Sequence, residues 1–514
     1  MSNEEKINFF ISKLEDLNIT PNSRWAIYGT GKGAELVFIA MERMGINSAI
    51  KIIIDRDDKV NSDTKFCGIS VVKLLDAINF VDGILIAAMN NHEIIYNRIQ
   101  NSLCDVQKNN LQIIDLLFHV TKAEKVEYVN FIEKNILRKS NTFIEFDEKS
   151  YCRKKDDVKA IAWYLPQFHQ IDINNKFHGQ GFTEWTNTSS AIPMFTGHYQ
   201  PHIPYDVGYY DLLNADTLKR QIYLAKQYGI YGFCIHYYWF SGKRIMEKPL
   251  ELLLEHKELD IPFCFNWATE NWTALWDGGN KQIMLEHVLN EEDDEKFMAD
   301  ILPYMKDSRY IKIEGKPVLV IYRVDMFRKE RIYKMLGNFR KIAQREGFSD
   351  LYIMLTNACG FQDTVTEWGA DALVEFPPHG IMNLFKEARP TGYLNPYYNG
   401  IILDATTFVK EKEYFIPHNN NKYFRSVLTS WDNTARKATS GGIIITGLSP
   451  TTSKQWLRDI IIESQEIHSD SEHIIFVNSW NEWAEGSHLE PDMKYGYAYL
   501  QVLKDTIEEM RNDT

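Results

Sequence analysis

The chain has 514 residues, more than one hydrophobic core usually holds, so two or three domains are expected. Its formal net charge of −13 offers no basic surface to a phosphate backbone, and nucleic acid is therefore not an expected partner. The six cysteines show no CxxC spacing, which fits a reducing compartment.

The first predicted element is an amphipathic helix at the N-terminus. Ile7, Phe10, Ile11 and Leu14 recur at helical spacing behind an acidic start, a pattern that does not fit a signal peptide. No uninterrupted apolar stretch reaches the length of a membrane span. We therefore expect a soluble, cytoplasmic protein without a membrane span.

Strands alternate with helices over roughly the first 120 residues. Apolar runs at 25–28, 50–54 and 84–88 predict strands, and helical apolar spacing follows the first and third of them. Alternation of this kind predicts a parallel, doubly wound sheet. We expect residues 1–120 to form a Rossmann-like domain.

The turn after the first strand is a candidate nucleotide site. Gly29, Gly31 and Ala34 have the spacing of the GxGxxG/A fingerprint, and Asp55 ends the second strand where an acid would bind a ribose. Lys32 would suit the phosphates of a sugar nucleotide as well as those of NAD. Such turns also close sheets that bind no nucleotide, so both interpretations stay open.

Residues 121–157 are predicted to be a helical and charged linker, and residues 158–514 a second domain. Eight short apolar strands recur there with helices between them, which predicts a (β/α)8 TIM barrel. The strands are expected at 160–164, 231–236, 262–266, 318–322, 351–356, 372–375, 426–430 and 474–477.

Polar and aromatic residues follow these strands repeatedly. In a barrel, strand C-termini meet at one rim, where carboxylates and amides can bind sugar hydroxyls and aromatic rings can cover a sugar face. Each single residue could equally be core or rim packing. The substrate-binding candidates are Tyr164, Gln167, His169, Glu184, Trp185, His236, Tyr237, Trp239, Asn266, Trp267, Glu270, Asn271, Trp272, Glu375, Trp431, Trp480 and Asn481.

The last strand runs into Asn-Glu-Trp-Ala-Glu-Gly, residues 481–486, which places two carboxylates three residues apart. A turn ending the strand, followed by Gly486, would aim Glu482 and Glu485 into one cleft. Cleaving a glycosidic bond requires one protonated and one ionised carboxyl, so these two are the catalytic candidates. A surface pair of salt-bridged glutamates is the alternative.

No metal site is predicted. His198 and His202 have the spacing of ligands on a helix, but Pro201 between them interrupts that geometry. The predicted barrel also needs no organic cofactor.

Several long motifs, in the same order, resemble the WbsX-type family of bacterial polysaccharide-biosynthesis proteins, which is also described as glycoside hydrolase family 99-like. The resemblance covers about residues 158–505. It is carried by residues 163–169, 179–187, 197–201, 208–211, 237–244, 265–273 and 481–486.

The resemblance implies a barrel similar to that of endo-acting α-mannosidases, whose catalytic pair lies in a Glu-Trp-His-Glu motif. By this likeness Glu482 deprotonates a substrate 2-hydroxyl, which attacks the anomeric carbon to give an anhydrosugar. Glu485 protonates the leaving oxygen and later activates the acceptor, so configuration is retained. Burial between Trp480 and Trp483 would raise the pKa of the acid. Ala484 stands where the hydrolases carry His, which leaves the close identity of the substrate open.

The same resemblance implies an oligo- or polysaccharide substrate, with α-linked mannose-type sugars expected, and a place in O-antigen or capsule biosynthesis beside other assembly enzymes. Water or a sugar could be the acceptor. Two alternatives remain: a glycosyltransferase that holds a sugar-nucleotide donor on the N-terminal domain, and a non-catalytic glycan-binding scaffold.

Overall fold

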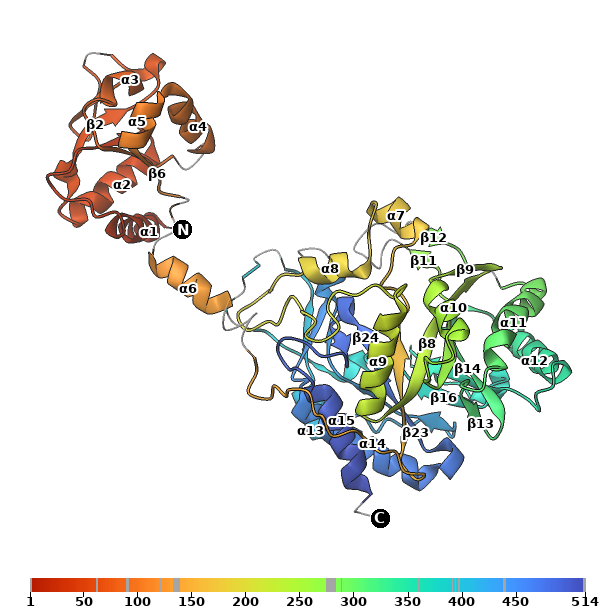
Figure 1. Ribbon diagram of the computed structural model, residues 1–514. Helices are drawn as coiled ribbons and strands as arrows, with labels where there is room; N and C mark the ends of the chain where they lie inside the picture. The colour runs from red at the N-terminus through yellow and green to blue at the C-terminus, as the bar shows by residue number, and fades with distance from the viewer. Residues whose placement is uncertain are drawn as a thin grey trace. The chain divides into compact units, whose positions relative to one another are not determined.

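The computed structural model describes residues 2–61, 63–88, 92–117, 119, 122–132, 139–273, 283–287, 289–358, 360–390, 392, 394–395, 398–437 and 441–511. The chain divides into two compact units, Met1–Ile132 and Glu133–Thr514 (Figure 1). Among the residues described, none of the helices combines the length and the apolar character that crossing a bilayer requires.

The first unit contains a six-stranded sheet. Its strands are β1 Trp25–Tyr28, β2 Ile50–Ile54, β3 Lys65–Phe66, β4 Ile69–Val72, β5 Gly83–Ile86 and β6 Gln112–Asp115. They lie in the order β3-β4-β2-β1-β5-β6, and all neighbours are parallel except β3 and β4. The helices are α1 Asn3–Glu15, α2 Lys32–Arg43, α3 Leu74–Ala77, α4 His92–Ser102, α5 Asp105–Asn110 and α6 Lys122–Ile132.

Both faces of this sheet are covered, because β1 and β5 are buried at every position. Successive side chains of a strand point to opposite faces. Ile27 accordingly packs in one hydrophobic cluster with residues of α1 and α2, such as Phe10 and Val37. Tyr28 belongs to a second cluster with Leu74 of α3. A sheet buried on both sides is typical of parallel α/β units.

The second unit is built around eight parallel strands, and each begins within two residues of the start of a strand expected from the sequence. They are β7 Lys159–Tyr164, β8 Ile230–Phe240, β10 Phe263–Ala268, β14 Lys316–Tyr322, β15 Tyr352–Asn357, β16 Ala372–Glu375, β20 Ser426–Leu428 and β23 Ile474–Asn478. Their order, β16-β15-β14-β10-β8-β7-β23-β20, follows the chain once the last strand has paired with the first. This confirms the predicted α/β class with a nearly closed parallel barrel.

The barrel closes along one short stretch of chain. β19, Tyr423–Phe424, pairs with β16, whereas β20 pairs with β23, and Arg425 lies between them. Arg425 is buried and donates to Glu375 at 2.5 Å and to Glu463 at 2.7 Å. Two anions therefore hold this cation at the seam.

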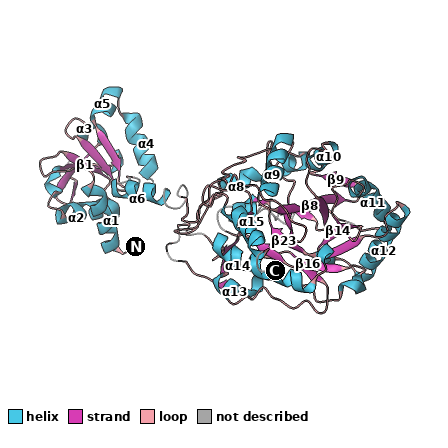
Figure 2. Cartoon of the chain, turned by 60° about the horizontal axis from the view of Figure 1, so that its bottom comes forward, coloured by secondary structure: helices cyan, strands magenta, loops and turns pink. Residues whose placement is uncertain are grey.

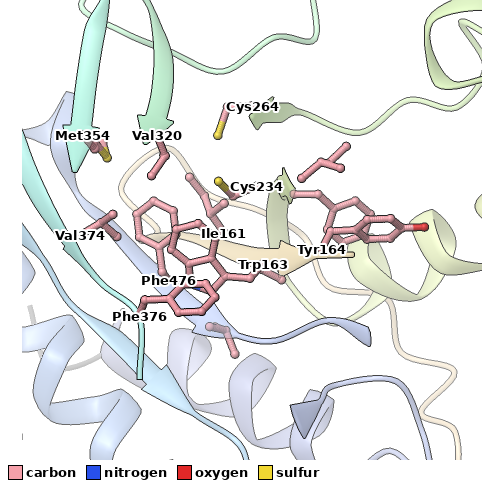
Figure 3. Close-up of a cluster of buried hydrophobic side chains, with 14 of the residues drawn as sticks. Ile161, Trp163, Tyr164, Cys234, Cys264, Val320, Met354, Val374, Phe376 and Phe476 are labelled. Atoms are coloured by element: carbon pink, nitrogen blue, oxygen red, sulfur yellow. The ribbon is translucent and has the colours of Figure 1, made fainter. Parts of the chain in front are cut away.

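Bulky side chains fill the inside of the barrel, as the close-up in Figure 3 shows. The indole of Trp163 stacks on Phe476 with ring centroids 4.9 Å apart and meets the edge of Phe376 at 4.8 Å. Cys234 and Cys264 are buried free thiols that pack there as small apolar groups. The interior is thus a packed core below the rim.

Helices surround the strands of this unit (Figure 2). Those described are α7 Asp172–His178, α8 Glu184–Ser190, α9 Ala215–Gln227, α10 Lys248–Glu255, α11 Glu291–Met305, α12 Lys329–Arg345, α13 Thr406–Lys410, α14 Pro450–Ile467 and α15 Ala498–Met510. Additional short strands are β9 Lys243–Ile245, β11 Trp272–Thr273, β12 Ile283–Leu285, β13 Lys312–Ile313, β17 Lys386–Glu387, β18 Ile401–Asp404, β21 Trp431–Asp432, β22 Ile443–Thr446, β24 Asn481–Glu482 and β25 Ser487–His488.

The segment before β7 packs on the second unit. Asp147 forms an ion pair at 2.6 Å with Lys504, which is on α15. Asp157 forms one at 2.7 Å with Arg511, which directly follows that helix. Residues 139–157, expected in a linker, therefore contact the C-terminal helix.

Candidate active site

Both candidate catalytic carboxylates lie on a hairpin that follows β23. The strands β24 and β25 pair antiparallel, with Glu482 opposite Ser487, and residues 483–486 form the turn between them. Gly486 has φ 63°, and a Cβ there would come within 3.2 Å of Asp432, so the tight turn favours glycine. The turn directs Glu482 and Glu485 into the same cavity.

Arg436 connects three carboxylates at this point. It lies in a short 3₁₀ segment, Asn433–Lys437, after β21. Its Nη2 donates to Glu482 at 3.0 Å, its Nη1 to Glu485 at 2.9 Å, and its Nε to Glu184 at 3.4 Å. One buried cation thus serves a cluster of three carboxyl groups, whose mutual repulsion when ionised would otherwise be large.

The two glutamates differ in burial. The side chain of Glu482 is 5% exposed, whereas that of Glu485 is 18% exposed. Burial raises the pKa of Glu482 to about 8; Arg436 and the amide of Gln167 lower it, and the charges of Glu485 and Glu184 raise it. Gln167 Nε2 lies 3.1 Å and 3.2 Å from the two carboxylate oxygens. Glu482 therefore holds or releases its proton near neutral pH.

The carboxylate found between the two tryptophans is Glu490. Trp480 Nε1 and Trp483 Nε1 donate to it at 3.1 Å and 2.6 Å, and burial raises its pKa to about 7. The sequence had placed Glu485 in that position. The difference arises because the hairpin turns both indoles away from the cavity and toward the chain that follows β25.

The cavity has a volume of about 370 Å³ and two chemically different walls. Glu184, Glu482, Glu485 and Arg436 line one part. Aromatic rings line another, where Tyr238 and Trp272 stack with centroids 5.8 Å apart and planes inclined by 27°. A cavity lined both by carboxyl groups and by flat rings suits a sugar, which has hydroxyl edges and apolar faces.

The family model for glycosyltransferase WbsX matches residues 160–503, well over half of the chain. The chain belongs to the WbsX glycosyltransferase family. This agrees with the resemblance carried by the sequence motifs, and it assigns the barrel to a carbohydrate-active family.

Two curated relatives from Xanthomonas campestris pv. campestris, strains ATCC 33913 and B100, are both named "Uncharacterized protein WxcX". They are 33% and 32% identical over 347 residues, which is 68% of this chain. The chain spans about half the length of these relatives, since the match covers 49% of each.

Solved structures with a similar fold include a GH99 endo-α-mannosidase from Bacteroides thetaiotaomicron, 14% identical, with a TM-score of 0.42 over 70% of this chain and 99% of that one. Another is a glycoside hydrolase-like protein, 13% identical, with a TM-score of 0.43 over 71% of this chain and 98% of that one. We draw no conclusion about substrate from similarities at this level.

In this WbsX-family barrel the cavity brings together nine of the residues expected from the sequence. They come from the ends of five different barrel strands or from the segments that follow them, as a barrel rim requires. The nine are Gln167, Glu184, His236, Glu270, Asn271, Trp272, Trp431, Glu482 and Glu485.

Other expected residues point away from the cavity, because strand side chains alternate. On β8, His236 and Tyr238 face the cavity, while Tyr237 hydrogen-bonds Asp300 and Trp239 packs edge-on against Phe297. On β10, Trp267 stacks on Phe297 with centroids 4.0 Å apart. A run of four consecutive aromatic or polar residues at a strand end thus contributes only alternate members to the site.

The remaining candidates support the site or the barrel. Asn481 exchanges two hydrogen bonds with the backbone of Leu165, at 2.8 Å and 2.9 Å, and Asn266 contacts His236 at 3.3 Å. The others are buried against neighbouring elements: Tyr164 bonds Gln221, Trp185 donates to the carbonyl of Tyr210, Trp480 donates to Glu490, Glu375 pairs with Arg425, and His169 is 2% exposed.

Sequence reasoning missed Arg436, Tyr238 and Arg323 as cavity residues. Arg323 follows β14 and pairs with Glu270 at 2.5 Å. Tyr238 could have been found by applying the two-residue period of a strand to His236. For Arg436 the only signal was indirect, since three converging carboxylates need a cation somewhere.

In the N-terminal unit the Gly-rich turn and Asp55 lie together. Gly31 is the N-cap residue of α2, and Ala34 is buried in that helix. Asp55 follows β2, and its Oδ2 accepts from the backbone N–H of Thr30 at 3.0 Å. Both lie at the carboxyl ends of neighbouring parallel strands, where α/β sheets bind ligands.

His198 and His202 do not share a site. His198 Nε2 lies 2.6 Å from Asp432, and His202 Nδ1 lies 2.8 Å from His488 Nε2. Among the described residues, His202, His488 and Asp492 are buried with their donor atoms within 4.8 Å of one another, the one grouping that could hold a metal ion. The distance between the two histidine nitrogens is that of a direct hydrogen bond.

Proposed function

We propose that the barrel is an enzyme that cleaves or transfers an α-linked glycosidic bond, of mannose type, with retention of configuration, in the biosynthesis of a bacterial surface polysaccharide such as O-antigen or capsule. The observation that carries the proposal is the convergence of Glu482 and Glu485 on one cavity that also presents stacked aromatic rings. Membership of the WbsX family supports a role in sugar transfer.

The burial of Glu482 suits it to act as the base. A carboxylate whose pKa is raised to about 8 binds a proton more strongly than an ordinary glutamate, so it can take the proton of a substrate 2-hydroxyl. The freed 2-oxygen attacks the anomeric carbon as the bond from that carbon to the leaving oxygen breaks. A 1,2-anhydrosugar results.

Glu485 completes the cycle from the more exposed side of the pair. It donates its proton to the leaving oxygen, and then takes a proton from the acceptor, which attacks the anomeric carbon and opens the anhydrosugar. Glu482 returns its proton to the 2-oxygen. Two inversions at one carbon give net retention. The cation of Arg436, held 3.0 Å and 2.9 Å from the two glutamates, stabilises whichever of them is ionised at each stage of the cycle.

The test is Glu485→Gln with turnover and binding measured separately. Turnover of an α-mannoside with a poor leaving group should fall at least about 1000-fold, whereas glycan binding remains measurable. Glu251→Gln makes the same change outside the cavity, at a carboxylate on α10 that pairs with Arg244 at 2.9 Å, and serves as the control. Equal turnover by Glu485→Gln and wild type would refute the assignment. Product analysis with and without a sugar acceptor separates transfer from hydrolysis.

A second proposal concerns the N-terminal unit. We propose that it is a Rossmann-like module whose Gly29–Gly31 turn holds the phosphates of a sugar nucleotide, with Asp55 ordering the turn through Thr30. The support is the position of the turn at the N-terminus of α2, where backbone N–H groups favour phosphate.

Calorimetry with a panel of sugar nucleotides tests this second proposal. Lys32→Gln should weaken binding, because Lys32 is the first residue of α2, and Lys51→Gln, an exposed lysine on β2, should not. The absence of heat with every donor, or equal weakening by both variants, would contradict it.

A further inference from the structure

Glu490 lies behind the hairpin and receives four hydrogen bonds. Its Oε1 accepts from Gln221 Nε2 at 2.7 Å and from Trp480 Nε1 at 3.1 Å. Its Oε2 accepts from Trp483 Nε1 at 2.6 Å and from the Tyr210 hydroxyl at 2.8 Å. The side chain is 1% exposed, so it contacts no substrate in the cavity.

The four donors belong to two bodies. Trp480 and Trp483 are part of the hairpin, whereas Gln221 is on α9 and Tyr210 lies before that helix. One carboxylate therefore fixes the hairpin to the barrel wall. Trp483 and Ala484 lie between the two glutamates in the sequence, so the residue whose indole Glu490 holds is part of the turn that carries them.

Burying the Glu490 carboxylate among these donors costs free energy. All four groups described as donating to the Glu490 carboxylate are neutral, and burying a carboxylate without a cation is expensive. Four convergent N–H and O–H donors nevertheless hold one orientation, because a carboxylate accepts along defined lone-pair directions. Burial raises the pKa of Glu490 to about 7, which is consistent with this expense.

We propose that Glu490 is a positioning residue that orients Trp480 and Trp483, and through them Glu482 and Glu485. The proposal rests on the catalytic function proposed above, and it adds the group that gives the pair its geometry. A Gln side chain at 490 would present an NH₂ group to two of the four donors, and the repulsion between these donors would displace the hairpin. Since a displacement of about 1 Å costs on the order of 100-fold in rate, position is the quantity to test.

The first experiment compares Glu490→Gln with Glu472→Gln. Glu472 is also a buried carboxylate with a phenol donor, Tyr352 at 2.6 Å, but it precedes β23 at the opposite end of the barrel. Glu490→Gln is expected to lower kcat about 100-fold with KM changed less than about threefold. Glu472→Gln is expected to leave both near wild type. Equal kinetics for the two variants would overturn the proposal.

The second experiment does not depend on turnover. Hydrogen–deuterium exchange should rise in residues 479–490 of Glu490→Gln and stay at the wild-type level in that segment of Glu472→Gln. Unchanged exchange in both variants would overturn the positioning role. A wild-type protein that turned over no glycoside would instead count against the catalytic proposal alone.

Single-donor variants cover the case in which Glu490→Gln does not fold. Trp483→Phe removes the indole N–H donor but keeps an aromatic ring. It should lower kcat and raise exchange in the hairpin. Where both single variants fold, the double variant should lower kcat by less than the product of the two single effects, because both changes break one shared contact. Wild-type kcat and hairpin exchange in Trp483→Phe would contradict the proposal.

Discussion

Arg436 and Glu482 form a buried ion pair, with Nη2 and Oε1 3.0 Å apart and each side chain less than 10% exposed. The pair is not isolated, because the same guanidinium also serves Glu485 and Glu184. Removing the cation would leave three acidic groups together in a region of low polarity. The state of charge of the site therefore depends on this one side chain.

Arg436→Met should accordingly destabilise the protein and reduce activity. Breaking a buried pair by removing one partner costs about 3–5 kcal/mol, because an uncompensated charge remains. Urea unfolding at pH 7 measures the loss. Arg323→Met, which breaks the more exposed pair with Glu270 in the same cavity, should cost less. An equal cost for both variants would contradict the central role of Arg436.

The raised pKa of Glu482 makes stability depend on pH. Its ordinary value is 4.5 and its value in the folded protein is about 8, so between these limits the folded state binds more protons than the unfolded state. Stability from this group therefore falls as pH rises from about 4.5 to 8. Glu482→Gln removes the effect, and its gain in Tm over wild type should be larger at pH 8.5 than at pH 5. A gain that is independent of pH would contradict the shift.

The same group should shape the activity profile. If Glu482 is the base, it acts only when ionised, so kcat/KM should rise with pH through an apparent pKa near 8. Initial rates from pH 5 to 9.5 measure the profile. An acid limb near 4.5 would show that Glu482 is not the ionisation that controls the reaction.

Tyr238 and Tyr237 are neighbours with opposite roles, and they make a matched pair. Tyr238→Ala should raise KM about tenfold with little change in kcat, since stacking beside Trp272 is worth about 1 kcal/mol or more. Tyr237→Phe should leave KM unchanged and lower stability, because it loses only the hydrogen bond to Asp300. Kinetics and thermal unfolding of both variants distinguish these outcomes. Equal KM effects would mean that β8 does not present alternate faces.

Glu375 was expected to bind sugar, yet it lies at the barrel seam with Arg425. Glu375→Gln should cost about 3–5 kcal/mol in unfolding free energy and leave KM within about twofold. Arg345→Met is the control, because the pair of Arg345 with Glu295 is exposed and screened by solvent and should contribute little to stability. A change in KM without a loss of stability would support the sugar-binding role of Glu375 that was expected from the sequence.

The sequence predicted the barrel strands well because each is an apolar run bounded by polar residues. Val318–Tyr322, for example, is buried at every position in β14. It also predicted the turn that directs Glu482 and Glu485 into one cavity, because the types and spacing of these residues are local. These features need no knowledge of distant parts of the chain.

The sequence could not predict contacts that join distant segments. Arg436 and Glu184 are in contact although they lie 252 positions apart in the sequence, and no motif connects them. Glu490 takes the place expected for Glu485 because the indoles of Trp480 and Trp483 rotate to the far side of the hairpin. Which way a side chain at a turn points depends on the packing around it, which a local pattern does not contain.

The pairing of the first barrel strand with the last has a consequence for synthesis on the ribosome. β7 finds one of its two neighbours only in β23, through contacts such as Ile161 with Phe476. Synthesis starts at the N-terminal end, so the first barrel strand keeps an unpaired edge until β23 has also been synthesised. The hairpin that carries Glu482 and Glu485 follows β23 immediately, so a chain that stops before β23 lacks both the closed ring and this pair of glutamates.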